Sequence, residues 1–134
     1  MTNSIQHKIL LISAIFGALA VVAGAFGAHA LAERIPSTSL EVWKTAVLYQ
    51  FIHVLAILSL KAHVRTILYW FSGILLFSGS LYALSTSGLH SVNLSWLGPV
   101  TPIGGLLFIL GWLSYVRELW QDKAKTMARH KKTF

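Results

Sequence analysis

Residues 9–32 read ILLISAIFGALAVVAGAFGAHALA and contain no charged side chain. A transmembrane helix needs about 20 mostly apolar residues to cross about 30 Å of hydrocarbon. The stretch therefore predicts a membrane-spanning helix over 9–32. The AHA tripeptide at 28–30 is similar to a signal-peptidase site, but the apolar run exceeds the usual length of a signal peptide's hydrophobic region, so we expect this helix to be retained.

The whole chain of 134 residues has the same apolar character. Hydrophobic residues make up 55% and charged residues only 11%, against roughly 25% charged in a soluble domain. The chain has no cysteine, which excludes disulfides, thiolate metal ligands and cysteine nucleophiles. Its four carboxylates are Glu33, Glu41, Glu118 and Asp122.

Three further stretches have the length and hydropathy of membrane spans, at 39–62, 66–86 and 102–120. Thr38 and Glu41 have the spacing of a capping box, with Thr38 as the N-cap of the second helix. In TPIGG at 101–105, Thr101 can cap the fourth helix and Pro102 can occupy its first position.

These spans predict an all-α fold, an integral membrane four-helix bundle with antiparallel neighbours, in a single transmembrane domain of residues 1–134. Nine of the eleven lysines and arginines fall on the side of the two termini, and only Arg34 and Lys44 fall on the other. The positive-inside rule then places both termini in the cytoplasm. The basic tail 121–134 is expected to lie near anionic lipid, and it lacks the aromatic interleaving of a nucleic-acid site. Interfacial aromatic residues, among them Trp70, are expected near the inner boundary.

Small residues are expected to hold the helices together, because lipid tails remove the hydrophobic effect between helices. Along the first helix, Ser13, Gly17, Ala20, Gly24 and Ala28 recur at steps of three and four. The predicted helix-packing glycines are Gly17, Gly24, Gly27, Gly79, Gly104 and Gly111. We expect a compact, left-handed bundle with little internal volume.

Polar side chains inside the spans form the candidate site. Tyr49, Gln50 and His53 share one helical face. His29 and Tyr82 are expected at a depth near Tyr49, which predicts a polar cluster, and His29 is expected to bond Tyr49, Tyr82 or the region of Glu41 and Lys44. The candidate intramembrane polar site is His29, Tyr49, Gln50, His53 and Tyr82.

Three interpretations of this cluster stay open at the level of sequence. The side chains can bond one another and set helix register, they can form a solute, proton or lipid site, or they can ligate a metal or haem. No cysteine, aspartate or glutamate lies nearby to complete a metal shell, and His29 and His53 differ in depth by about 10 Å. We therefore predict no metal site and no cofactor.

A catalytic site would need a nucleophile with a base, two carboxylates or a metal. Ser78 and Ser80 have no evident base, and serines in membrane helices usually bond a carbonyl one turn back. No catalytic residue is predicted.

Three motifs read together, GAFGAHAL at 24–31, YQFIHVLAIL at 49–58 and TPIGGLLFILGW at 101–112, resemble the domain-of-unknown-function family number 423. GSLYAL at 79–84 supports the resemblance, which covers about residues 9–120. Members of the family are small four-span bacterial inner-membrane proteins, related to small mitochondrial transmembrane proteins. The resemblance implies the fold and the location, and it implies no activity.

We therefore expect a non-catalytic structural, assembly or lipid-interacting membrane module. Its expected partners are membrane lipid and a further copy of the chain or another membrane protein, with no nucleic acid. The alternative is an oligomeric transporter or channel for a small solute or protons that uses the polar residues of the second helix. A lipid-modifying enzyme is the third hypothesis.

Overall fold

The computed structural model describes residues 3–89 and 92–130, and every regular element in this part is helical. Lys131 and Lys132 of the predicted tail, and the loop residue His90, lie outside the described residues. The elements are α1 (Asn3–Phe26), the π-helix η1 (Gly27–Leu31), α2 (Ser37–Ser59), α3 (Val64–Gly73), the π-helix η2 (Ile74–Ser78), α4 (Gly79–Ser85), the short 3₁₀ turns η3 (Ser87–Leu89) and η4 (Ser95–Leu97), and α5 (Val100–His130).

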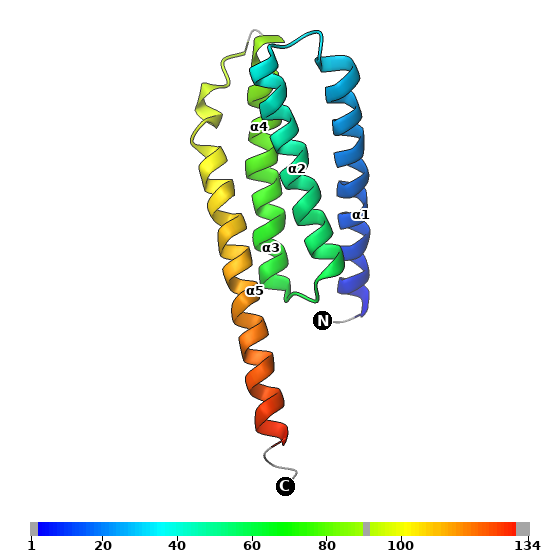
Figure 1. The fold of residues 1–134 in the computed structure, drawn as a ribbon, viewed down its shortest axis with the longest axis vertical. Helices are drawn as coiled ribbons and strands as arrows, with labels where there is room; N and C mark the ends of the chain where they lie inside the picture. Colours follow the sequence, from blue (N-terminus) through cyan, green and yellow to red (C-terminus); the bar gives the residue numbers. More distant parts are fainter. Residues whose placement is uncertain (1–2, 90–91, 131–134) are drawn as a thin grey trace.

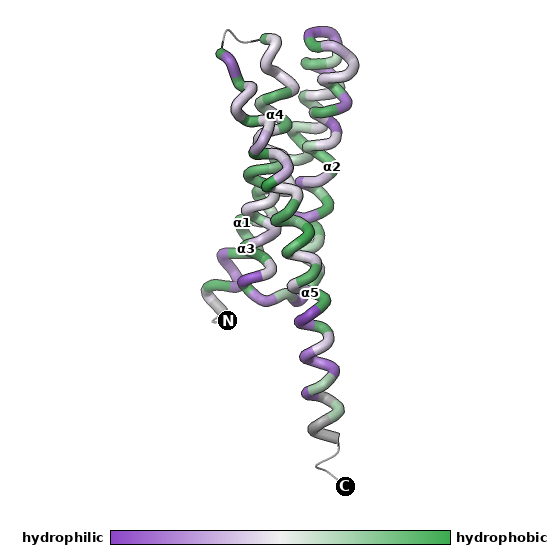
Figure 2. Tube along the Cα trace, turned by 90° about the vertical axis from the view of Figure 1, so that its left-hand side faces the viewer, coloured by the Kyte–Doolittle hydropathy of each residue, from purple (hydrophilic) through white to green (hydrophobic). Residues whose placement is uncertain are grey.

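Four helical stretches are long and apolar enough to cross a membrane, as predicted. They are Ser4–Leu31, Ser37–Ser59, Val64–Ser85 and Ser95–Lys125, with mean hydropathies of 2.6, 1.4, 1.6 and 1.5. Figure 2 shows apolar residues along the length of the bundle and hydrophilic residues gathered at its ends and on the projecting part of α5. Large apolar side chains cover the outside, since Val22, Leu75 and Leu113 are each about 60% exposed.

The four rods alternate in direction (Figure 1), which confirms the predicted antiparallel bundle. Both ends of the chain lie at one end of the bundle, here called the terminal end, and the opposite end is called the far end. α3, η2 and α4 form one continuous rod that packs on α2 and α5. Among the described residues, the backbone of α1 approaches only that of α2 and its own continuation η1.

Several helix ends differ from the predictions, among them the start of α1 at Asn3 rather than at residue 9 and the end of α2 at Ser59 rather than at residue 62. The N-cap of α2 is Pro36 rather than Thr38, so the capping box is wrong, and Glu41 instead pairs with Lys44 at 2.7 Å. α5 begins at Val100, and the hydroxyl of Thr101 lies 2.7 Å from that of Ser80 rather than capping the helix. α5 also continues past the predicted end at Trp120 to His130, and this last part projects beyond the bundle (Figure 1).

Glycines allow the closest approaches between helices, at three of the predicted positions. A Cβ at Gly104 would overlap the backbone of Phe77, and one at Gly111 would lie 2.5 Å from the ring of Trp70. A Cβ at Gly27 would lie 2.6 Å from the ring of Trp43. Gly73 contacts Phe108 in the same way and was not predicted.

The other predicted packing glycines have more room. A Cβ at Gly17 or Gly24 would make ordinary contacts, 3.4 Å from Val54 and 3.6 Å from Val47. A Cβ at Gly79 would meet nothing within 4 Å, so its prediction as a helix-packing residue is wrong. Trp70 is fully buried against Gly111, and its expected depth near the inner boundary stays a prediction.

Gly79 on α4 and Gly104 on α5 give a matched test of this packing. Gly104→Ala should destabilise the protein by about 1–3 kcal/mol, because its methyl group has to displace the backbone of Phe77. Gly79→Ala should be neutral or stabilise by up to about 1 kcal/mol, because alanine favours helix and the site is open. Thermal unfolding in one detergent measures both variants, and equal transition temperatures would contradict the packing described.

Candidate functional site

Gln50 and Tyr82 form the first of two polar contacts inside the bundle. The Tyr82 hydroxyl donates to Gln50 Oε1 at 3.0 Å, and Gln50 Nε2 donates to the carbonyl of Phe16 at 2.8 Å. Gln50 is buried, and the chain of bonds joins α4 to α2 and α2 to α1. These two predicted residues are therefore brought together.

His53 forms the second contact, one turn further along α2 and towards α5. Its Nδ1 lies 2.8 Å from the carbonyl oxygen of Tyr49, and Trp112 Nε1 donates to its Nε2 at 3.1 Å. A carbonyl only accepts and an indole N–H only donates, so Nδ1 carries the proton and the ring is neutral. The ring stacks on Phe108 with centroids 3.6 Å apart. Both nitrogens of His53 are thus occupied by protein.

Tyr49 lies with the His53 contact rather than with Gln50. Its ring centroid is 4.7 Å from that of Phe77 and 6.2 Å from that of His53. Its side chain is partly exposed, and it supplies a backbone acceptor rather than a hydroxyl to the site. The predicted cluster is therefore two separate contacts, one from α2 to α1 and α4 and the other from α2 to α5.

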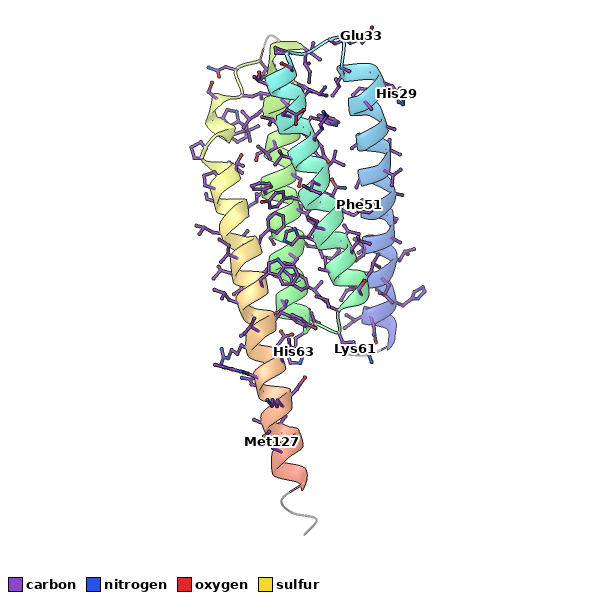
Figure 3. The ribbon with its side chains drawn as sticks, viewed as in Figure 1. His29, Glu33, Phe51, Lys61, His63 and Met127 are labelled. Atoms are coloured by element: carbon purple, nitrogen blue, oxygen red, sulfur yellow. The ribbon has the colours of Figure 1, made fainter. Side chains whose placement is uncertain are left out.

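His29 is far from both contacts, and the prediction that it bonds Tyr49, Tyr82 or the Glu41 region is wrong. Its side chain is exposed on η1 and points away from the bundle (Figure 3). His29 is two residues, or about half a helical turn, beyond Gly27 on η1, so it lies on roughly the opposite side from the Gly27 face that meets Trp43. Matching depth alone did not predict the side of the helix.

A furrow of about 430 Å³ opens between α1 and the rod of η2 and α4. Leu19 and Val22 line one wall, Leu75 and Gly79 line the other, and Gln50 and Tyr82 lie at its base. A second hollow of about 470 Å³ shares Trp43, Gly79 and Tyr82 with it and reaches Leu89 towards the far end. Trp43 is fixed at their junction by donating Nε1 to the carbonyl of Ala23 at 2.8 Å. The prediction of little internal volume is therefore wrong beside α1, where these two hollows lie.

Sequence analysis missed the role of Glu118, which is only 4% exposed. Its Oε2 accepts the backbone N–H of His63 at 2.9 Å, and its Oε1 accepts the hydroxyl of Thr66 at 2.6 Å. His63 Nδ1 stands 3.6 Å from Oε1. His63 is the N-cap of α3, so α5 supplies a carboxylate to the positive end of that helix. The partners are 52 and 55 residues apart in sequence, and no local pattern reveals them.

The two serines of the enzyme hypothesis are held by hydrogen bonds. Ser80 bonds the carbonyl of Phe77 at 3.0 Å, as predicted, whereas Ser78 reaches across to the carbonyl of Ala46 on α2 at 2.8 Å. Within residues 3–89 and 92–130, no three histidine, aspartate or glutamate side chains are grouped so that they could hold a metal ion.

Comparison with known proteins identifies relatives along most of the chain. The profile of a family described as "Protein of unknown function (DUF423)" matches residues 23–105. The UPF0382 membrane protein YwdK of Bacillus subtilis is 42% identical over 117 residues, covering 80% of this chain and 91% of its own. The UPF0382 inner membrane protein YgdD of Escherichia coli is 41% identical over 112 residues, covering 77% and 82%. A UPF0382 membrane protein of Haemophilus influenzae is 35% identical over 127 residues, covering 89% and 98%. No solved structure matches.

Removing the donor to His53 tests the second contact. Trp112→Phe keeps an aromatic ring but leaves Nε2 of His53 without its partner, which should cost about 1–2 kcal/mol of unfolding free energy. Trp120→Phe is the control, since Trp120 is 77% exposed, and it should change stability by less than about 0.5 kcal/mol. Unfolding of both variants in the same detergent gives the comparison, and an equal loss in the two would remove the role assigned to the bond.

Glu118 provides a test of the carboxylate at the start of α3. Glu118→Ala should destabilise by about 2–3 kcal/mol, because a buried backbone N–H and a hydroxyl lose a charged acceptor. Glu118→Gln keeps an acceptor oxygen and should lose less. The exposed Glu41→Ala is the control for loss of charge. A Glu118→Ala protein that unfolds at the wild-type temperature would exclude this structural role.

Proposed function

The chain belongs to the family of unknown function DUF423, and we propose that it is a non-catalytic, lipid-interacting protein of the bacterial inner membrane. The furrow between α1 and α4 binds a hydrocarbon chain of a membrane lipid. The observation that carries the proposal is a furrow with apolar walls, over a neutral polar pair, on the side of a membrane-spanning bundle.

The rim of the furrow supports a hydrocarbon occupant. Leu19, Val22 and Leu75 are 52%, 63% and 59% exposed, so the surface that would face lipid continues into the furrow. An empty space of this size forfeits dispersion contacts along its walls, and a flexible chain from the bilayer can restore them. The adjoining hollow towards Leu89 extends the path along the axis of the bundle.

The base of the furrow argues against a charged or strongly polar occupant. Gln50 and Tyr82 bond each other, and Gln50 also bonds the carbonyl of Phe16, so the pair is neutral and already has partners. Ions and polar solutes need new hydrogen bonds to replace those they lose on leaving water. A hydrocarbon chain needs none.

The transporter alternative has less support from the same residues. His53 was its candidate proton or solute ligand, and both ring nitrogens are engaged by Tyr49 and Trp112 while Phe108 covers the ring. The serines of the enzyme hypothesis bond backbone carbonyls. We therefore assign a binding role without transport or catalysis.

The proposal includes an orientation. Lys8, Lys61, Arg65 and Arg117 lie towards the terminal end, and Arg34 and Lys44 lie towards the far end. The positive-inside rule favours a cytoplasmic terminal end. The E. coli relative YgdD is named an inner membrane protein, which supports that membrane.

Filling the furrow from inside the protein tests the proposal. Gly79→Leu places a side chain in the furrow where a Cβ meets no neighbour within 4 Å, so the fold should tolerate it. Native mass spectrometry of protein released from lipid nanodiscs should show fewer retained lipids than for the wild type.

Ala14→Leu is the matched control, because Ala14 is exposed on α1 and does not line the furrow. It adds the same side chain outside the site and should leave lipid retention unchanged. Wild-type lipid retention in the Gly79→Leu protein, at unchanged thermal stability, would overturn the proposed function.

A further inference from the structure

A second groove lies at the terminal end and shares no residue with the furrow described above. Its volume is about 630 Å³. It is bounded by the first turns of α1, the last turns of α2, the loop after Ser59 and the start of α3. Figure 3 shows Lys61 on this loop, beside the start of α1. The groove therefore sits where the spans leave the hydrocarbon.

The inner walls of this groove are apolar and its mouth is basic. Of the lining residues, Ile57 and Ile67 are buried and Ile9 is half-buried, whereas Leu10, Gln6, Ser59, Lys61 and His63 are exposed. Apolar walls under a cationic rim fit a molecule with a hydrocarbon chain and an anionic head.

The positive charge of Lys61 is not neutralised within the protein. No ion pair is found for it in the described part of the chain, and its side chain is exposed. The nearest acid to the loop is Glu118, which is committed to His63 and Thr66. Asp122 lies 3.9 Å from Lys125, and Glu33 and Glu41 belong to the far end. The cation is thus available for a ligand.

Two further basic residues near the groove also lack an ion pair in the described part of the chain. Lys8 on α1 and Arg65 on α3 are both exposed near its mouth, and neither has an ion pair among the described residues. Basic pockets between membrane helices at the headgroup level attract phospholipid head groups. A soluble anion would gain the charge contact but would leave the apolar walls uncovered.

We propose that this groove binds one anionic phospholipid, with its phosphate at Lys61 and an acyl chain along Ile9, Leu10 and Ile57. The site goes beyond the proposed function, since it uses other residues and selects a charged lipid class. Either site can fail without the other. Gln6 and Ser59 supply neutral hydrogen-bonding groups to the phosphate oxygens.

The test uses the full chain in phosphatidylcholine nanodiscs that contain a minor share of phosphatidylglycerol, with retained lipids identified by native mass spectrometry. Wild-type protein should retain phosphatidylglycerol in preference to phosphatidylcholine. Lys61→Gln should lower that preference by about five-fold, the effect expected of one basic group near a membrane surface. Lys61→Arg should keep it.

Lys123→Gln is the matched control, because it removes the same charge from the projecting part of α5, away from the groove. It should change the preference by less than two-fold. Equal losses in Lys61→Gln and Lys123→Gln would show a diffuse surface effect and overturn the site.

Two further measurements complete the design. Displacement of phosphatidylglycerol by millimolar inorganic phosphate would mean a free-anion site and would also overturn the proposal. Gly79→Leu, examined in parallel, should keep the phosphatidylglycerol preference while losing lipid from the other furrow. In lipid-free detergent, Lys61→Gln should unfold at the wild-type temperature, since Lys61 is exposed.

Discussion

The packing of α5 on the rod of α3 and η2 depends on aromatic residues that lie directly against glycines. Phe77 packs its backbone on Gly104, Trp70 covers Gly111, and Phe108 covers Gly73. Lipid surrounds the bundle with material as apolar as its own side chains, so contact and hydrogen bonding, rather than exclusion of water, hold the helices together. These close contacts also fix the rotation of α5 about its own axis. That rotation places Phe108 on the face of His53 and aims the indole N–H of Trp112 at its Nε2.

A second constraint acts on every polar group within the spans, because hydrocarbon offers no hydrogen bonds. Several of these groups serve as cross-links, whereas Ser13 bonds the carbonyl of Ile9 within α1 and the buried Nε1 of Trp70 has no hydrogen-bond partner among the described residues. Gln50 ties α2 to α1, Ser78 ties the central rod to α2, and Ser80 meets Thr101 of α5. The buried acid, Glu118, lies at the terminal end and faces the positive end of α3, where its charge has both donors and a favourable dipole. Many polar side chains that look functional in the sequence thus hold the helices together by hydrogen bonds.

The spans were predictable because hydropathy and charge are local properties of the chain, and the shared face of Gln50 and His53 followed from helical spacing. The predictions that proved wrong depended on how each helix is rotated relative to its neighbours, which the sequence pattern does not give. Gly79 and Gly104 look alike in sequence, yet one faces open space and the other a backbone. His29 has the right depth but the wrong side of its helix. The partners of Glu118 are more than 50 residues away, so only the packed fold reveals them.

The position of α1 explains why the furrow and the basic groove both lie beside it. Its glycine-bearing face rests on α2, and its backbone approaches no other helix among the described residues. Towards the central rod it makes a ring contact, Phe16 against Phe71 with centroids 5.6 Å apart. The furrow lies on one side of that contact along α1 and the basic groove on the other, as their lining residues show. Whatever fills these spaces bears on α1 and on the rod together. Lipid bound at either of the two proposed sites would therefore stabilise the attachment of α1 by mass action, because each site exists only in the assembled bundle.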